Sequence, residues 1–80
     1  MKIVSFNQII ELNKLLRIKD LQFKIHIKDA CGGQSFYIEQ LGQSDGDNRK
    51  EEMHQMIEQF FADNKMTIVY AEDKIHFTME

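Results

Sequence analysis

The residues best suited to chemistry lie in one short segment, which separates two stretches of alternating apolar and polar residues. It holds the chain's only cysteine, Cys31, followed by its only Gly-Gly pair. A cysteine thiolate is a strong nucleophile and metal ligand, and paired glycines allow positive φ and close backbone approach. We therefore expect any site to include the loop residues Asp29, Cys31, Gly32, Gly33 and Gln34.

A reactive thiol needs neighbours that stabilise its charged form. His26 and Lys28 lie close to Cys31 in the sequence, and the glycine amides could hold an anion. Asp29 acts in the opposite direction, because a nearby carboxylate disfavours a thiolate, and there is no second cysteine to resolve an oxidised thiol. We expect Cys31 to be a small residue in a tight loop, with thiol-dependent redox or nucleophilic activity as the alternative.

A metal site is a weaker interpretation of the same residues. His26, Asp29 and Cys31 have spacings that a loop could gather, and His76 is a further candidate ligand. A structural zinc site normally requires four ligands, mostly Cys and His. We therefore predict no catalytic residue, no metal and no cofactor.

Alternation on both sides of the loop predicts a β-hairpin. Residues 21–28 alternate without error, with apolar side chains on one face and polar ones on the other. Residues 35–41 are the expected partner strand, with Phe36 and Ile38 inward and Tyr37 outward. If the register holds, the polar residues Lys24, His26, Lys28, Tyr37, Glu39, His76 and Thr78 share one open sheet face.

Lysines around a tyrosine suggest an anionic ligand or single-stranded nucleic acid. The phenylalanines Phe23, Phe36 and Phe77 alternate inward, however, so the open face lacks the several aromatics that RNA-binding sheets present. We therefore do not favour a nucleic-acid partner and keep it as a second alternative. The main hypothesis is a non-enzymatic binding or regulatory module that contacts an unidentified partner, with a protein as the candidate, through the loop and the open face.

Two amphipathic helices complete the pattern. Ser5 with Gln8 and Asn48 with Glu51 have the spacing of capping boxes. The first helix should end near Arg17, and the second should end at Asn64 in a left-handed conformation. The expected apolar faces are Phe6, Ile9, Ile10, Leu12, Leu15 and Leu16 in the first helix and Met53, Met56, Ile57, Phe60 and Phe61 in the second.

Residues 66–71 and 74–79 then predict two more strands joined at Glu72-Asp73. The whole chain, residues 1–80, is expected to form a single two-layer α+β domain in αββαββ order, with two helices on one face of a four-stranded, largely antiparallel sheet. This order is a circular permutation of the ferredoxin-like βαββαβ arrangement, which offers one topology. We expect the core to centre on Phe23, Ile25, Phe36, Ile57, Phe60 and Phe77.

Composition fits a small soluble protein, with 42% hydrophobic and 29% charged residues. The apolar runs are too short to span a bilayer, we find no secretory signal, and one cysteine cannot form an internal disulfide. We therefore expect a cytoplasmic monomer or weak dimer. Residues 1–28 carry a net charge of +4 and residues 29–80 a net charge of −7, so a uniformly basic surface is excluded.

The segment 28–36, Lys-Asp-Ala-Cys-Gly-Gly-Gln-Ser-Phe, followed by residues 73–78, Asp-Lys-Ile-His-Phe-Thr, resembles the RDAC family of small bacterial proteins. That family is named after an Arg-Asp-Ala-Cys signature, in which Lys28 takes the arginine position here. The substitution keeps the charge and loses the bidentate geometry of arginine. The resemblance implies a small bacterial protein and supplies no catalytic residue.

Overall fold

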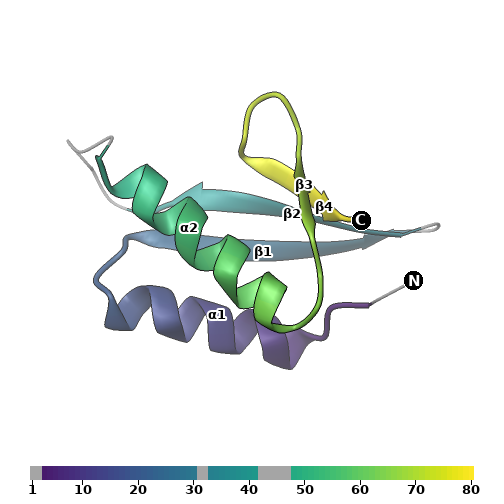
Figure 1. The fold of residues 1–80 in the computed structure, drawn as a ribbon, viewed down its shortest axis with the longest axis horizontal. Helices are drawn as coiled ribbons and strands as arrows, with labels where there is room; N and C mark the ends of the chain where they lie inside the picture. Colours follow the sequence, from purple (N-terminus) through teal and green to yellow (C-terminus); the bar gives the residue numbers. More distant parts are fainter. Residues whose placement is uncertain (1–2, 31–32, 42–47) are drawn as a thin grey trace.

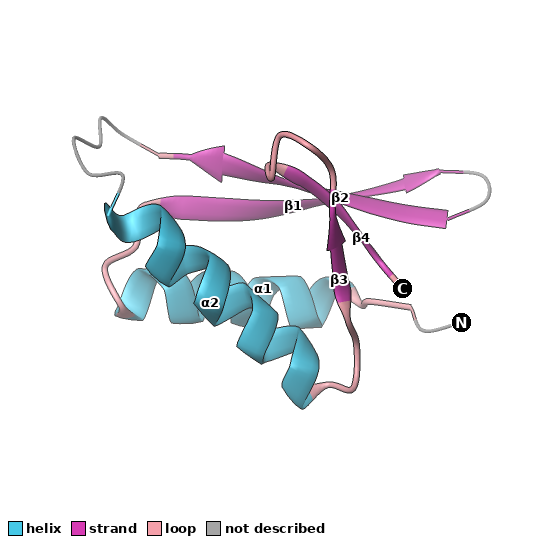
Figure 2. Ribbon diagram, turned by 45° about the horizontal axis from the view of Figure 1, so that its top comes forward, coloured by secondary structure: helices cyan, strands magenta, loops and turns pink. Residues whose placement is uncertain are grey.

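The computed structural model describes residues 3–30, 33–41 and 48–80. The elements follow the predicted αββαββ order, and both helices cover one face of the four-stranded sheet while its other face stays open (Figure 1, Figure 2). The expected two-layer α+β architecture is therefore confirmed. The elements are α1 (Phe6–Ile18), β1 (Phe23–Ala30), β2 (Gly33–Gln40), α2 (Asn48–Asp63), β3 (Ile68–Tyr70) and β4 (His76–Met79).

The sheet has the strand order β1-β2-β4-β3, and all three neighbouring pairs are antiparallel. Moving the first strand of a ferredoxin-like βαββαβ unit to its end gives the same order, because the two central strands then become β2 and β4. The last two strands are shorter than the sequence predicted. They start at Ile68 and His76, and residues 72–75 belong to the turn between them.

Helix α1 begins as predicted and buries a narrower face than expected. Ser5 and Gln8 form a reciprocal capping box, which satisfies backbone N–H groups that the first turn leaves open. The buried residues are Ile9, Leu12 and Leu16. Phe6 and Ile10, which we had expected in the core, are 65% and 63% exposed.

Helix α2 packs through Met53, Ile57 and Phe61, which follow each other at four-residue intervals and are all buried. Phe60 was expected at the centre of the core and is only partly buried at its margin. The other five predicted core residues, Phe23, Ile25, Phe36, Ile57 and Phe77, are buried as expected.

The residue with left-handed backbone at the end of α2 differs from the predicted one. Lys65, and not Asn64, has the left-handed φ of 63°. The Asn64 side chain instead donates a hydrogen bond of 2.8 Å to the carbonyl of Phe60.

Two side-chain amides tie the helical layer to the sheet. The Asn13 amide of α1 accepts from the backbone N–H of Ile25 at 2.8 Å and donates to its carbonyl at 3.0 Å. The Gln34 amide of β2 makes the same pair of bonds with Val4, at 2.9 and 2.8 Å. Since β1 is an edge strand, Asn13 also occupies backbone groups of Ile25 that would otherwise be open to another chain.

None of the helices in the described ranges is both long and apolar enough to cross a membrane.

The two neighbouring phenylalanines of α2 provide a test of the core. Phe61 is fully buried and packs on the stacked pair Phe36 and Phe77, with its ring centroid 6.2 Å from each. We expect Phe61→Ala to lower the free energy of unfolding by about 3–5 kcal/mol and Phe60→Ala to lower it less. Urea denaturation of both variants measures the difference, and a larger loss for Phe60→Ala would contradict this packing.

Candidate functional site

The open sheet face carries a row of three rings, His26, Tyr37 and His76, hereafter the ring row. The strand register places Tyr37 opposite His26 on one side and opposite His76 on the other. The imidazole of His26 stacks on Tyr37 with centroids 4.6 Å apart and planes 13° apart. His76 lies at 6.1 Å from Tyr37, tilted by 37°. The predicted placement of all three on one face is therefore confirmed.

A carboxylate holds the imidazole at each end of this row. Nε2 of His26 lies 2.6 Å from Oε1 of Glu39. At the other end, Nδ1 of His76 lies 2.7 Å from Oδ2 of Asp73. Each histidine thus contacts both the Tyr37 ring and a carboxylate, which limits the orientations that its imidazole can take.

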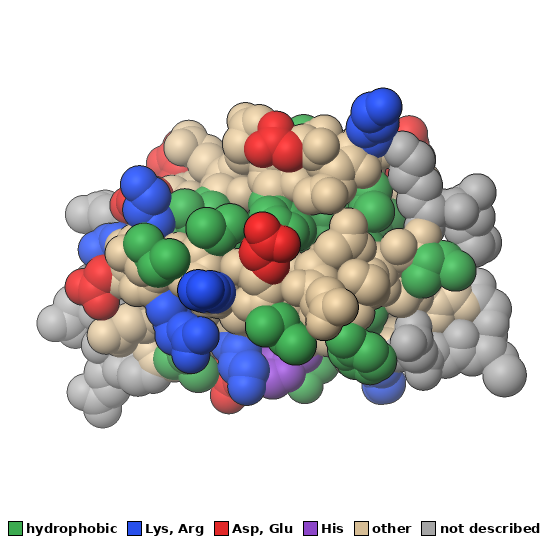
Figure 3. Space-filling view, turned by 90° about the horizontal axis from the view of Figure 1, so that it is seen from below, with side chains coloured by type: hydrophobic (Ala, Val, Ile, Leu, Met, Phe, Trp, Pro, Cys, Tyr) green, Lys and Arg blue, Asp and Glu red, His purple; other side chains and the backbone are tan. Residues whose placement is uncertain are grey.

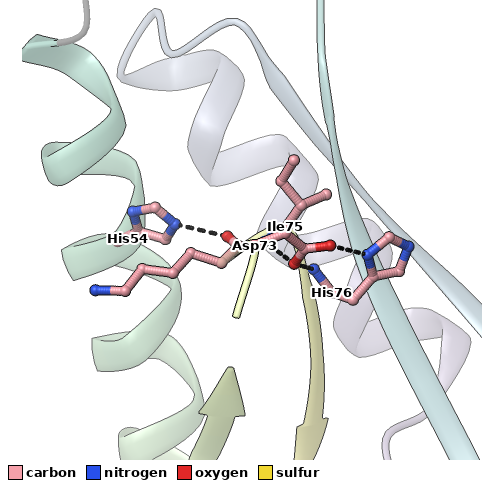
Figure 4. Close-up of polar contacts among 5 residues, drawn as sticks. His54, Asp73, Ile75 and His76 are labelled. Atoms are coloured by element: carbon pink, nitrogen blue, oxygen red, sulfur yellow. Dashed lines mark hydrogen bonds and ion pairs between the residues drawn. The ribbon is translucent and has the colours of Figure 1, made fainter. Parts of the chain in front are cut away.

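Asp73 also builds the turn that leads into β4. Its Oδ1 accepts hydrogen bonds from the backbone N–H groups of Ile75 and His76, at 2.8 and 2.9 Å (Figure 4). An aspartate that bonds the backbone two and three residues later is a common turn device. Lys74 has φ of 56° within this turn, and its carbonyl lies 3.1 Å from Nε2 of His54 on α2.

These bonds change the acidity of Asp73. Hydrogen bonds from the backbone of His76 and Ile75, then from the His76 side chain, lower the pKa of Asp73 from 3.8 to about 2. Each of them favours the charged carboxylate. The turn therefore keeps its acceptor ionised over the whole physiological range.

A second polar cluster lies between α2 and the end of β3. The Tyr70 hydroxyl donates a 2.8 Å hydrogen bond to Glu58, and the ring meets His54 edge-on at 5.2 Å. Burial, with Glu58 as the further cause, raises the pKa of Tyr70 well above its ordinary value. Tyr70 therefore stays neutral and serves as a donor.

A shallow hollow opens between α2 and the β3–β4 turn. Its volume is about 370 Å³, and its walls are mostly apolar. The residues that line it include Met53, His54, Lys74 and Ile75. It lies beside the turn of Figure 4 and does not reach the ring row.

The residues of the predicted loop site do not all lie on the open sheet face. Cys31 and Gly32 lie outside the described residues, so thiol chemistry at Cys31 stays a prediction from the sequence. Gly33 has the expected positive φ, 157°, with open space where a Cβ would stand. The Gln34 amide makes two hydrogen bonds with the backbone of Val4. It lies on the opposite sheet face from Tyr37, because side chains alternate between faces along a strand and these two residues are three positions apart.

The other predicted site residues follow the same alternation. Lys28 is exposed on β1, two positions from His26, and Lys24 is exposed on its other side. Asp29 pairs with Gln34 in the strand register. Within the described ranges, no group of three or more His, Cys, Asp or Glu side chains could hold a metal ion.

The chain was compared with protein-family models, curated proteins and solved structures. No match was found in any of the three. The site is therefore interpreted from its own geometry.

Sequence reasoning did not find the role of Asp73 or the ring stacking. An aspartate followed three residues later by the first residue of a strand is the available signal for the turn. His26 stacks on Tyr37 through the hairpin pairing of β1 with β2. The position of His76 beside Tyr37 depends on the pairing of β2 with β4, two segments about forty residues apart, which no local pattern specifies.

Asp73 predicts a pH dependence of stability. The pKa of Asp73 in the folded protein is below its ordinary value. Its contribution to the free energy of unfolding is therefore fully present above about pH 4 and is lost as the pH falls toward 2. We expect the free energy of unfolding of wild type to fall more steeply over this interval than that of Asp73→Asn. Glu72→Gln, a change at the neighbouring exposed carboxylate, is the control and should behave like wild type. Urea denaturation at a series of pH values measures this, and parallel curves for wild type and Asp73→Asn would contradict it.

Proposed function

We propose that this chain is a non-enzymatic binding module whose contact surface is the ring row on the open sheet face. The observation that supports it is the position of three rings outside the core. Tyr37 remains 38% exposed, although its neighbours Phe36 and Ile38 are buried against the helices. A tyrosine held rigidly at the surface offers contact area and a hydroxyl with little loss of conformational entropy.

The orientation of the rings favours a protein partner. Because His26 and Tyr37 stack face to face, these faces are occupied by each other. The row offers ring edges, with imidazole nitrogens and the Tyr37 hydroxyl, and few free faces. Such edges suit hydrogen bonding to a polypeptide surface, where tyrosine is enriched.

The same geometry argues against single-stranded nucleic acid. Base stacking needs free aromatic faces and a positive groove for the backbone. Here the carboxylate of Glu39 contacts His26 and that of Asp73 contacts His76. A phosphate chain that crosses the row would meet this negative charge, and Lys24 and Lys28 lie only along β1.

Asp29 and Gly33 lie where β1 ends and β2 begins, on the same two strands as His26 and Tyr37. We include the loop that the sequence predicts between these strands in the proposed contact region. We place the protein in a bacterial cytosol, in line with its single cysteine and its resemblance to the RDAC family. The resemblance supplies no activity, so the proposal depends on the open face.

Truncation of Tyr37 tests the proposal. Tyr37→Ala removes the central ring, and we expect at least about tenfold weaker binding of partner protein. Tyr37→Phe keeps the stacking and loses only the hydroxyl, so its loss should be smaller. The measurement is quantitative affinity capture from the source cells, followed by titration of the protein whose capture depends on Tyr37.

Gln55→Ala, on the exposed side of α2, is the control and should bind like wild type. Equal capture by wild type and Tyr37→Ala would overturn the proposal. Capture that disappears after nuclease treatment would replace the protein partner with nucleic acid.

A further inference from the structure

The outer face of α1 carries large apolar side chains that the fold leaves in solvent. Phe6, Ile10 and Ile18 are 65%, 63% and 67% exposed. Seen from below, hydrophobic side chains are spread over this face, and Lys and Arg side chains gather toward one end (Figure 3). Exposed apolar groups gathered on one face in this way mark an interaction surface more often than single scattered ones do.

These residues form one stripe. Phe6, Ile10, Lys14 and Ile18 follow each other at intervals of four, so they lie along one side of the helix. Ile9, Leu12 and Leu16 point to the core instead. The stripe therefore contributes nothing to the packing of the helix on the sheet.

We propose that a second copy of this chain covers this stripe through an antiparallel α1–α1 contact about a two-fold axis. With the axis near the middle of the helix, at the level of Leu12, Phe6 meets the partner's Ile18. Ile10 then meets the aliphatic stem of the partner's Lys14. Both contacts occur twice, as an isologous interface requires.

Charge supports this occupant. Glu11 and Lys14 are both exposed, and neither has an ion pair with another of the described residues. In the antiparallel arrangement Glu11 lies beside the partner's Lys14, so that two opposite-charge pairs form across the axis. An anionic membrane surface fits less well, because it would place the exposed carboxylate of Glu11 against lipid phosphate.

The size of the contact limits its strength. Helix α1 has 13 residues, which corresponds to a length of about 20 Å. A single helix pair of this length buries less than the roughly 1,000 Å² typical of stable complexes. The dimer should therefore be weak and in exchange with the monomer.

Sedimentation equilibrium over a concentration series from micromolar to millimolar tests this inference. The average mass of the wild-type protein should rise from 9.5 kDa toward about twice that value. Ile10→Glu should remain monomeric throughout the series. Val69→Glu, the same kind of change at an exposed residue of β3, is the control and should associate like wild type.

A charge exchange tests the register. Glu11→Lys alone should weaken association at least several-fold, and the double change Glu11→Lys with Lys14→Glu should restore it. All variants alter exposed side chains, so they should fold like wild type, and circular dichroism is the measurement that checks this. A wild-type chain that stays monomeric at every concentration would overturn the proposal, and so would a double variant no better than Glu11→Lys. Monomeric protein that sediments with anionic phospholipid vesicles would assign the stripe to a membrane surface.

Discussion

The antiparallel register of the β1–β2 hairpin is the constraint on which the rest of the structure depends. With Ile25 opposite Ile38 and His26 opposite Tyr37, the large apolar residues Phe23, Ile25, Ile27, Phe36 and Ile38 turn to one face, and the rings of His26 and Tyr37 turn to the other. A slip by one residue would exchange these two sets. This register gives the helices an apolar sheet face to cover, and it places His26 and Tyr37 on the open face.

The helical side stabilises that register in two ways. Apolar side chains from both helices and three strands form one continuous core, whose burial supplies most of the free energy of folding. The amides of Asn13 and Gln34 add specific hydrogen bonds at Ile25 and Val4. Each amide both donates a hydrogen bond to a backbone carbonyl and accepts one from the N–H of the same residue. Such directional bonds fix the positions of α1 and of Val4 before it more narrowly than apolar contact alone.

Local patterns predicted the elements, and long-range pairing decided the details. The capping-box spacings and apolar helical faces predicted the two helices, and the patterns of residues 21–28, 35–41, 66–71 and 74–79 predicted the four strands, which gave the αββαββ order. They were not sufficient to choose between Phe60 and Phe61, because either phase of the helix presents an apolar stripe. The exposure of Phe6 and Ile10 depends on the rotation of α1 about its own axis relative to the sheet. The spacing of apolar residues in a helix does not determine this rotation. The candidate site was predicted as a set of residues on one face, whereas the place of His76 beside Tyr37 required the pairing of β2 with β4.

The central claim is that the pairing of β2 with both β1 and β4 brings His26, Tyr37 and His76 into one row on the open face. Proton NMR of the wild-type protein tests it directly, through nuclear Overhauser effects between aromatic ring protons. The structure predicts cross-peaks from the Tyr37 ring to the imidazoles of both His26 and His76. Cross-peaks from the Tyr37 ring to the methyl groups of the core residues Leu12 and Ile57, with none to either imidazole, would show that β2 presents its other face and would contradict the account.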